Sequence, residues 1–177
     1  MLQLRITAVS ALTEEQKNEI WEMLVLADKE FVPPLSERRN TLQTQWETHE
    51  IEALNVPTVY YEIMLKQEFV LALDEAKVVG FMSYIPEKQI ELENGKGIVA
   101  DYVSTIIVHP EYRSNGITRA LYNYLLAQKS EGFIATRTWS TNDAHLHILE
   151  KMGFQNIWTI KNDRAEGIDT VYYCRKR

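Results

Sequence analysis

A polar turn in the middle of the chain contains residue types that can bind a phosphate group. It runs from Arg113 to Thr118 and joins an apolar, β-branched segment to residues with helical spacing. The first N–H groups of a helix have no partner within it and lie at the positive end of its dipole. Gly116 has no side chain to block a ligand, and Arg113 adds positive charge. The spacing therefore favours a phosphate or diphosphate site, although an ordinary strand-to-helix loop with a glycine fits it as well.

Two stretches around this turn have the order of a known pair of motifs. Residues 108–118 read VHPEYRSNGIT, and they are followed by TNDA at 141–144 and LEKMGF at 149–154. The first stretch matches neither a Walker loop nor a dinucleotide G-x-G-x-x-G pattern. It resembles motif A of the GNAT acetyltransferases, V-x-P-x-[YF]-[QR]-x-x-G-x-[GA], and the second is similar to motif B of that family. The resemblance covers roughly residues 99–154, and two motifs in order are more specific than either alone.

The resemblance implies acetyl-CoA as a co-substrate and assigns residues to it. In the family, motif A holds the pyrophosphate, and the pantetheine arm enters a gap between two splayed strands, where it adds like a further strand. Here those strands would end at Val108 and Ser140, and the Asn of motif B, Asn142, would contact the arm. The residues expected to bind the co-substrate are Ile106, Ile107, Val108, Arg113, Ser114, Asn115, Gly116, Ile117, Thr118, Asn142 and His145.

The chain departs from the family pattern at three positions. Thr118 stands where Gly or Ala is usual, and Ser114 stands where Gly is common. Leu149 stands where many members carry a Tyr that protonates the leaving thiolate. Because Leu149 has no proton to give, the resemblance does not assign the general acid.

The implied reaction is transfer of an acetyl group to a primary amine by direct attack in a ternary complex. The resemblance points to the backbone N–H of Val108 as the donor to the developing oxyanion. Acetyl transfer to an amine also needs a place for the amine proton. The catalytic candidates are Asp101, His145 and Tyr102, none of which is fixed by its spacing alone.

Each catalytic candidate has a competing structural interpretation. Asp101 is the carboxylate nearest in sequence to the expected pocket, but a solvated strand residue fits as well. His145 shares a helix face with Asn142 and Leu149, and a partly exposed structural histidine fits equally. Tyr102 is a candidate acid by proximity in sequence only, and packed tyrosines are common. The alternatives left open are Glu62, Glu91 and Glu93 as bases and Tyr122 and Tyr124 as acids.

The acceptor is expected between the N-terminal helices and the C-terminal hairpin. Charged residues around that hairpin either contact it or are solvated: Arg164, Glu166 and Asp169. A small-molecule amine and a peptide or protein amine both remain open as partners. Two other classes also fit the sequence. One is a CoA-binding regulatory or interaction domain without turnover, and the other is a mixed α/β domain whose motifs are coincidental.

Composition narrows the class of protein. A chain of 177 residues predicts a single domain over residues 1–177, here a GNAT-like acetyltransferase domain. The formal charge of −6 and the lack of a basic, aromatic-studded stretch argue against nucleic-acid binding. Cys174 is the single cysteine and the N-terminus has no apolar leader, which favours a cytoplasmic protein. No apolar run approaches the ~20 residues of a membrane-spanning helix, so no membrane span is expected. No metal is expected, because His145 and His147 diverge on a helix.

The predicted elements form an α/β (α+β) fold, a mixed, mostly antiparallel sheet of six or seven strands flanked by helices. A C-terminal edge strand could pair with a second copy in a homodimer. Strands are predicted at 2–6, 69–73, 78–85, 98–108, 133–140, 154–160 and 168–174, with a polar loop at 161–167. Helices are predicted from 13 to about 30, from 36 through the fifties, at 58–67, from 117 to about 130, and at 142–152.

Overall fold

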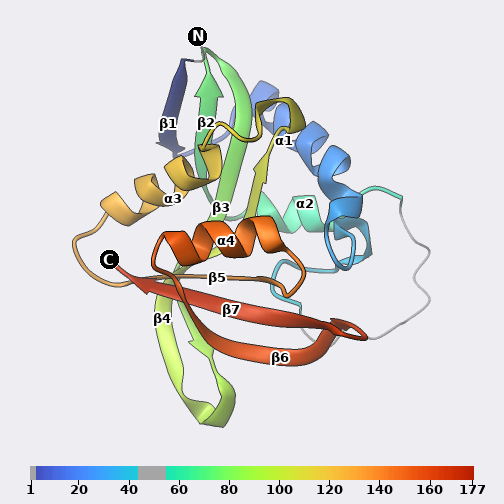
Figure 1. The fold of residues 1–177 in the computed structure, drawn as a ribbon. Coiled ribbons are helices and arrows are strands. Elements are labelled where there is room, and N and C mark those ends of the chain that lie inside the picture. The colour runs from blue at the N-terminus through green and yellow to red at the C-terminus, as the bar shows by residue number, and fades with distance from the viewer. Residues whose placement is uncertain (1–2, 44–54) are drawn as a thin grey trace.

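The computed structural model describes residues 3–43 and 55–177 and contains one seven-stranded sheet (Figure 1). The strand order is β1-β2-β3-β4-β5-β7-β6. The strands are β1 (Leu4–Val9), β2 (Glu68–Asp74), β3 (Lys77–Glu91), β4 (Gly97–Val108), β5 (Phe133–Trp139), β6 (Gln155–Ala165) and β7 (Ile168–Lys176). The α-helices are α1 (Glu14–Ala27), α2 (Thr58–Met64), α3 (Ile117–Ala127) and α4 (Asp143–Lys151). The predicted fold class, a mixed and mostly antiparallel sheet flanked by helices, is confirmed.

The sheet contains one parallel pair of strands, between β4 and β5. Helix α3 makes the crossover between them, and the other neighbouring strands in the sheet run antiparallel. The last strand, β7, lies between β5 and β6, so the outermost strands are β1 and β6. The C-terminal strand is therefore not an edge, and a pairing of two copies through this half of the sheet would use β6.

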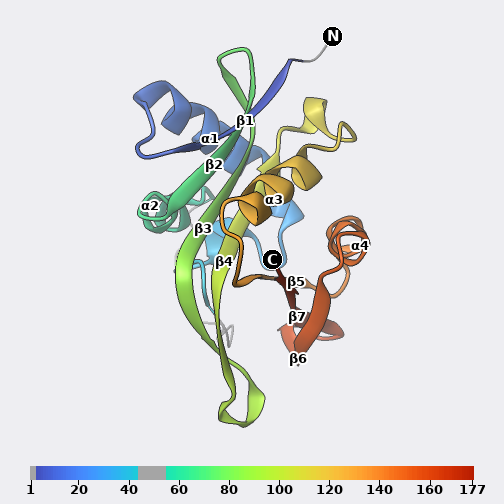
Figure 2. The same cartoon turned by 90° about the vertical axis from the view of Figure 1, so that its left-hand side faces the viewer.

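Helices cover both faces of the sheet. Helices α1 and α2 lie on one face, and α3 and α4 lie on the other (Figure 2). The core on the α1 and α2 side includes Ile20, Leu24, Tyr60, Met64, Leu71 and Phe81. The core on the α3 and α4 side includes Val70, Met82, Leu121, Leu125, Ile134 and Leu149. Thr13 caps α1 through a reciprocal bond with Gln16, as the sequence pattern of a hydroxyl before acidic residues predicts.

Strand β4 contains an irregularity that changes which residues face each core. Its pairing with β3 moves from Tyr84↔Val103 to Ser83↔Thr105, so Ser104 is an extra residue. Side chains of a regular strand alternate between faces. After the bulge, Ile106 joins the same core as Val103, while Ile107 packs on the opposite face. A bulge of this kind redirects the side chains at the end of the strand.

Several predicted boundaries differ from those of the structure. The helix predicted after Ser36 is absent at residues 38–43, and its remainder lies outside the described residues. Local bonds compete with a helix here, because the Asp28 carboxylate accepts from the Ser36 N–H and hydroxyl at 2.6 and 2.8 Å. Strand β3 continues past Pro86, and β6 continues through the predicted loop to a tight turn at Gly167. The second half of β6 was predicted as a loop because its residues are polar, as is common in an edge strand with one solvated face.

None of the helices among the described residues is both long enough and apolar enough to cross a lipid bilayer.

Candidate active site

A cavity of about 520 Å³ opens where strands β4 and β5 separate. Their pairing ends at Val103↔Thr136, although β4 continues to Val108 and β5 to Trp139. The Thr136 hydroxyl donates to the Val103 carbonyl at 3.0 Å, at the apex of the gap. The two strands diverge beyond this point (Figure 2). The predicted splay between the strands is thus present, and both strands line the cavity.

The edge of β4 that faces the gap presents main-chain groups at Ile106 and Val108. The His109 N–H donates to the Val79 carbonyl, so Val108 and Gly80 form a non-hydrogen-bonded pair of the antiparallel ladder. The alternation of an antiparallel ladder then gives Ile106 the same orientation. The N–H and C=O groups of these two residues therefore point away from β3 and toward the gap.

The predicted phosphate turn also opens to the cavity. Ser114 and Gly116 both have positive φ, 65° and 74°, and both line the cavity. The side-chain amide of Asn115 donates to the carbonyls of Tyr112 and Arg113 at 3.0 and 3.2 Å, which holds the turn. Within residues 3–43 and 55–177, no acceptor bonds the main-chain N–H groups of residues 114–119. The turn therefore offers a row of unused donors, together with the lining residues Ile117, Thr118 and Arg119.

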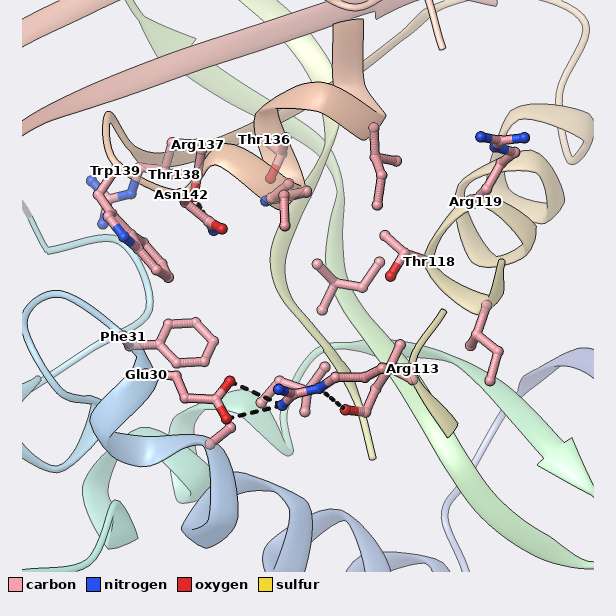
Figure 3. A pocket seen from close by; sticks show the side chains of 18 of the residues that line it. Glu30, Phe31, Arg113, Thr118, Arg119, Thr136, Arg137, Thr138, Trp139 and Asn142 are labelled. Atoms are coloured by element: carbon pink, nitrogen blue, oxygen red, sulfur yellow. Dashed lines mark hydrogen bonds and ion pairs between the residues drawn. The ribbon is translucent and has the colours of Figure 1, made fainter. Parts of the chain in front are cut away.

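Arg113 is held by a carboxylate from the N-terminal part of the chain. Its guanidinium donates to both oxygens of Glu30, at 3.0 and 2.9 Å, and to the Val108 carbonyl at 3.3 Å (Figure 3). Both partners of this ion pair are about half exposed, so its contribution to stability is small. Arg113 lines the cavity, but its charge is already balanced by Glu30.

Helix α4 contributes two predicted residues to the cavity wall. Asn142 stands at its N-cap position and donates through its side-chain amide to the Thr138 hydroxyl at 2.9 Å. His145 lies 3.0 Å, through Nε2, from the Tyr122 hydroxyl, and the two rings stack. Leu149 is fully buried in the core and does not line the cavity.

The environment of His145 makes it a neutral imidazole at physiological pH. Burial lowers the pKa of this histidine to about 4, and burial raises the pKa of the Tyr122 hydroxyl beside it. Either group of this pair can be the donor, because a neutral imidazole has two tautomers. The pair therefore places a neutral imidazole on the cavity wall, while its partner Tyr122, a candidate acid, is fully buried behind it and does not line the cavity.

Asp101 and Tyr102, the other two catalytic candidates, do not line the cavity. The Asp101 carboxylate is 3% exposed and is bonded by Arg177 at 2.8 Å, the Glu87 N–H at 3.0 Å and Lys129 at 3.1 Å. Burial would raise its pKa, but these bonds outweigh burial and lower it. This environment argues against a base, because the carboxylate is neutralised by two cations and is turned away from the gap.

Tyr102 points to the opposite face of β4 and packs with Ile90, Ala135 and Tyr172. Burial raises the pKa of its hydroxyl to about 12. The remaining candidates Glu62, Glu91, Glu93 and Tyr124 are also not part of the wall. Tyr124 instead accepts a bond from the Ala8 N–H at 3.1 Å. Proximity in sequence was a poor guide here, because the bulge at Ser104 separates the two ends of β4.

Several lining residues were not found from the sequence. Phe31 and Trp139 lie side by side at one end of the cavity, with ring centroids 5.4 Å apart (Figure 3). Arg38 and Arg137 also line it, with Arg164, which the sequence placed near the acceptor. Glu166 and Asp169 do not. Arg137 could have been recognised from the sequence as a candidate site residue, because a charged residue in the middle of a largely apolar strand is unusual.

The matched family model identifies the chain. The model described as Acetyltransferase (GNAT) domain matches residues 66–156, about half of the sequence. The chain belongs to the GNAT acetyltransferase family. No curated protein sequence matches this GNAT chain significantly.

Solved structures share the fold of this GNAT chain. An acetyltransferase of the GNAT family from Bacillus cereus has 15% identity and a TM-score of 0.62, with 99% of this chain and 98% of that one covered. A phosphinothricin acetyltransferase from Sinorhizobium meliloti in complex with acetyl-CoA has 18% identity and a TM-score of 0.64, covering 97% and 88%. An aminoglycoside 6'-N-acetyltransferase complexed with coenzyme A has 17% identity and a TM-score of 0.65, covering 97% and 96%. At these identities the likeness establishes the fold.

Proposed function

We propose that this GNAT protein transfers an acetyl group from acetyl-CoA to a primary amine by direct attack in a ternary complex. One observation carries the proposal: the row of unused N–H groups at residues 114–119 opens into the same cavity as the edge of β4 beyond Val103, with which β5 no longer pairs. A helix N-terminus of this kind suits a diphosphate. An extended arm suits a strand edge whose donors and acceptors have no neighbour.

The residues present fit acetyl-CoA along its length. The amides from Ser114 to Arg119 would hold the pyrophosphate, and the main-chain groups of Ile106 and Val108 would hold the pantetheine arm. Asn142 lies on the opposite wall and would contact the arm. When bound, acetyl-CoA supplies an activated thioester carbonyl; the protein supplies position, charge and a route for the proton.

The Val108 N–H is the proposed donor to the carbonyl oxygen as negative charge develops on it. The amine attacks in its neutral form, a C–N bond forms and the C–S bond breaks. The amine proton is proposed to leave through water near His145, a neutral imidazole on the wall that can orient the water but is too weakly basic to keep the proton. The thiolate needs no dedicated acid, since its unperturbed pKa is about 8.5. A thioester carbonyl outside hydrogen-bond reach of this strand in a CoA complex would contradict the assignment.

Thermal unfolding with and without CoA tests the binding step. At CoA concentrations about 100 times Kd, we expect Tm to rise by about 5–10 °C. Gly116→Trp should abolish this rise, because an indole at residue 116 would block the row of amides. The mutation also strains a residue at φ +74°.

Gly167→Trp is the matched control, because Gly167 has φ +75°, has no atom within 4 Å of an added Cβ, and lies away from the cavity. Both variants should lose similar stability without ligand, but only Gly116→Trp should lose the CoA effect. Equal CoA shifts in both variants would remove the turn from the proposal.

A CoA-binding domain without turnover is the second candidate function. It is favoured by the lack of a carboxylate base or tyrosine acid at the expected positions. Release of free thiol from acetyl-CoA in the presence of an amine panel separates the two functions. A CoA-dependent Tm shift without thiol release would favour the regulatory domain.

We also infer that residues 1–177 form one domain, because a single sheet runs from β1 to β6. The cytoplasmic location and the homodimer stay predictions.

A further inference from the structure

The end of the cavity away from α3 is rich in arginine. Arg38, Arg137 and Arg164 line it, and they come from three distant segments of the chain. Arg38 and Arg164 are each 6% exposed. The carboxylate found on the cavity wall among the described residues is Glu30, which is bonded to Arg113. The wall that would receive the acceptor therefore carries positive charge at fixed positions.

Bonds to the protein hold the three guanidinium groups close together. Arg137 donates to the Tyr172 hydroxyl at 3.3 Å and to the Gln43 carbonyl at 2.6 Å. Arg164 donates to the Thr170 hydroxyl at 2.7 Å, two residues from Tyr172 on the same face of β7. Arg38 and Arg164 also donate to one carbonyl, that of Val32, at 3.3 and 3.0 Å. The three groups are thus neighbours with their positions set by the fold.

Arg137 carries the strongest indication of a missing anion. Both of its acceptors are neutral oxygens, and no carboxylate of the described residues lies within ion-pair distance of it. Asp163 lies next to Arg164 in β6 and accepts from Thr170, but it does not line the cavity. A guanidinium has five N–H donors in a fork that matches a carboxylate, and two of those of Arg137 are used.

The cluster also raises the electrostatic cost of its own members. Burial, followed by the charges of Arg38 and Arg137, lowers the pKa of Arg164 to about 9. Burial lowers the pKa of Arg38 to about 10. Both values leave Arg38 and Arg164 protonated at neutral pH. The pKa of Arg137 is raised, because the effect of burial is outweighed by Tyr102 and Tyr172.

Aromatic side chains complete this end of the cavity. Phe31 and Trp139 flank the arginines, and the Arg38 guanidinium lies 5.3 Å from the centre of the Phe31 ring. Figure 3 shows Phe31, Trp139 and Arg137 on one side and Thr118 and Arg119 on the other. This wall suits an apolar body with an anionic group, and it repels a polycation.

We propose that the acceptor is a primary amine that also carries a carboxylate, of the amino-acid class. Its carboxylate would bind the Arg137 guanidinium, its side chain would lie against Phe31 and Trp139, and its amine would face the gap between β4 and β5. The inference rests on the proposed acetyl transfer and names the substrate class of that site.

Matched pairs of amines test the proposal in the wild-type protein. Thiol release from acetyl-CoA is measured with glycine, leucine and phenylalanine, each beside its amide, and with spermidine. We expect kcat/KM for each amino acid to exceed that for its amide by about 10- to 100-fold, the range of one charge-assisted bond or pair of bonds. Equal or faster reaction of the amides or of spermidine would overturn the proposal while leaving acetyl transfer intact.

Variants of Arg137 assign the effect to a residue. Arg137→Gln should reduce the acid-to-amide ratio toward one, and Arg137→Lys should leave it intermediate because the charge remains without the fork. Arg39→Gln is the control, since Arg39 is exposed and does not line the cavity, and its ratio should match that of the wild type. An unchanged ratio in Arg137→Gln, with its CoA-dependent Tm shift retained, would overturn the assignment to Arg137.

A binding measurement keeps the two proposals separable. Calorimetric titration of the CoA-saturated protein with alanine, alaninamide and 1-aminoethylphosphonic acid needs no turnover. Tighter binding of alanine supports the carboxylate class even if no thiol is released, in which case only the proposed transfer fails. Tighter binding of the amide, or of the phosphonic acid, would overturn the carboxylate proposal.

Discussion

At the scale of single residues, two of the three catalytic candidates, Asp101 and His145, have opposite environments. Asp101 is enclosed by cations at one end of β4, and His145 is partly buried without an ion pair at the cavity wall. Sequence position alone does not show whether an ionisable side chain faces the cavity or is enclosed by other charges. The physical difference appears only when the sheet is assembled, because Lys129 and Arg177 come from other segments.

Asp101→Asn should therefore be a stability mutation. It leaves the buried Arg177 and the half-exposed Lys129 without their counter-ion, and we expect the free energy of unfolding to fall by about 3 kcal/mol. The measurement is chemical denaturation at pH 7. The pH dependence of kcat/KM should keep its shape in the folded variant; a loss of its acidic limb would restore Asp101 as a base.

His145 should make stability depend on pH. The pKa of this histidine is lowered from 6.5 to about 4 in the folded protein. The unfolded chain therefore binds a proton between these values that the folded protein does not, and stability falls as pH decreases from 6.5 toward 4. The contribution lost should be roughly 2–3 kcal/mol.

His145→Gln should remove this contribution, since glutamine does not titrate. The difference in unfolding free energy between wild type and variant is measured at pH 7 and pH 4.5. His147→Gln is the control, because His147 is exposed on the same helix. A difference independent of pH for His145→Gln would show that its imidazole is solvated in the folded state.

At the scale of elements, periodicity predicted most of the helices and strands, and failed where local bonds or solvent exposure dominate. Strand β4, helix α3 and strand β5 match their predicted ranges closely because each buries an apolar face. The segment after Ser36 was misread because bonds to Asp28 and Val32 replace a helical pattern. That same segment contributes Arg38 to the cavity wall, and Arg38 belongs to no motif, so its place in the site could not be predicted from the sequence.

The contact between the 3₁₀ turn Asp28–Glu30 and the phosphate turn gives a prediction at this scale. Glu30 places a carboxylate on Arg113 beside the row of amides. Glu30→Gln removes a negative charge near the proposed diphosphate, so Kd for CoA should fall about threefold at low salt, and less above 0.5 M salt.

Glu111→Gln is the control for this substitution, since Glu111 is close in sequence to the turn but does not line the cavity. Isothermal titration at two salt concentrations measures both variants. Weaker CoA binding by Glu30→Gln would mean that Glu30 is needed to orient Arg113, and would contradict the charge argument.

At the scale of the whole molecule, the distribution of charge differs between the cavity and the chain. The formal charge is −6, yet five arginines and one glutamate line the cavity. The composition argued against nucleic-acid binding but did not predict the charge of the cavity. The sign of the cavity wall comes from the fold, which gathers Arg38, Arg137 and Arg164 from separate segments, and no count of residues could have predicted it.

The short pairing between strands β4 and β5 affects how easily the sheet opens between them. Only three residue pairs join these strands, Asp101↔Ile134 to Val103↔Thr136, within the described residues. Such a short parallel pairing holds the two halves of the sheet together with few hydrogen bonds. The amides of this pairing should therefore exchange with deuterium sooner than those of β2 and β3. A ligand lying along the open edge of β4 would add the missing rungs, so bound CoA should slow isotope exchange in β5 and β7 as well as at the turn. Mass spectrometry of peptides from β7, which pairs with β5 and β6, would measure this effect, and unchanged exchange there would mean that the β4–β5 junction is already rigid without ligand.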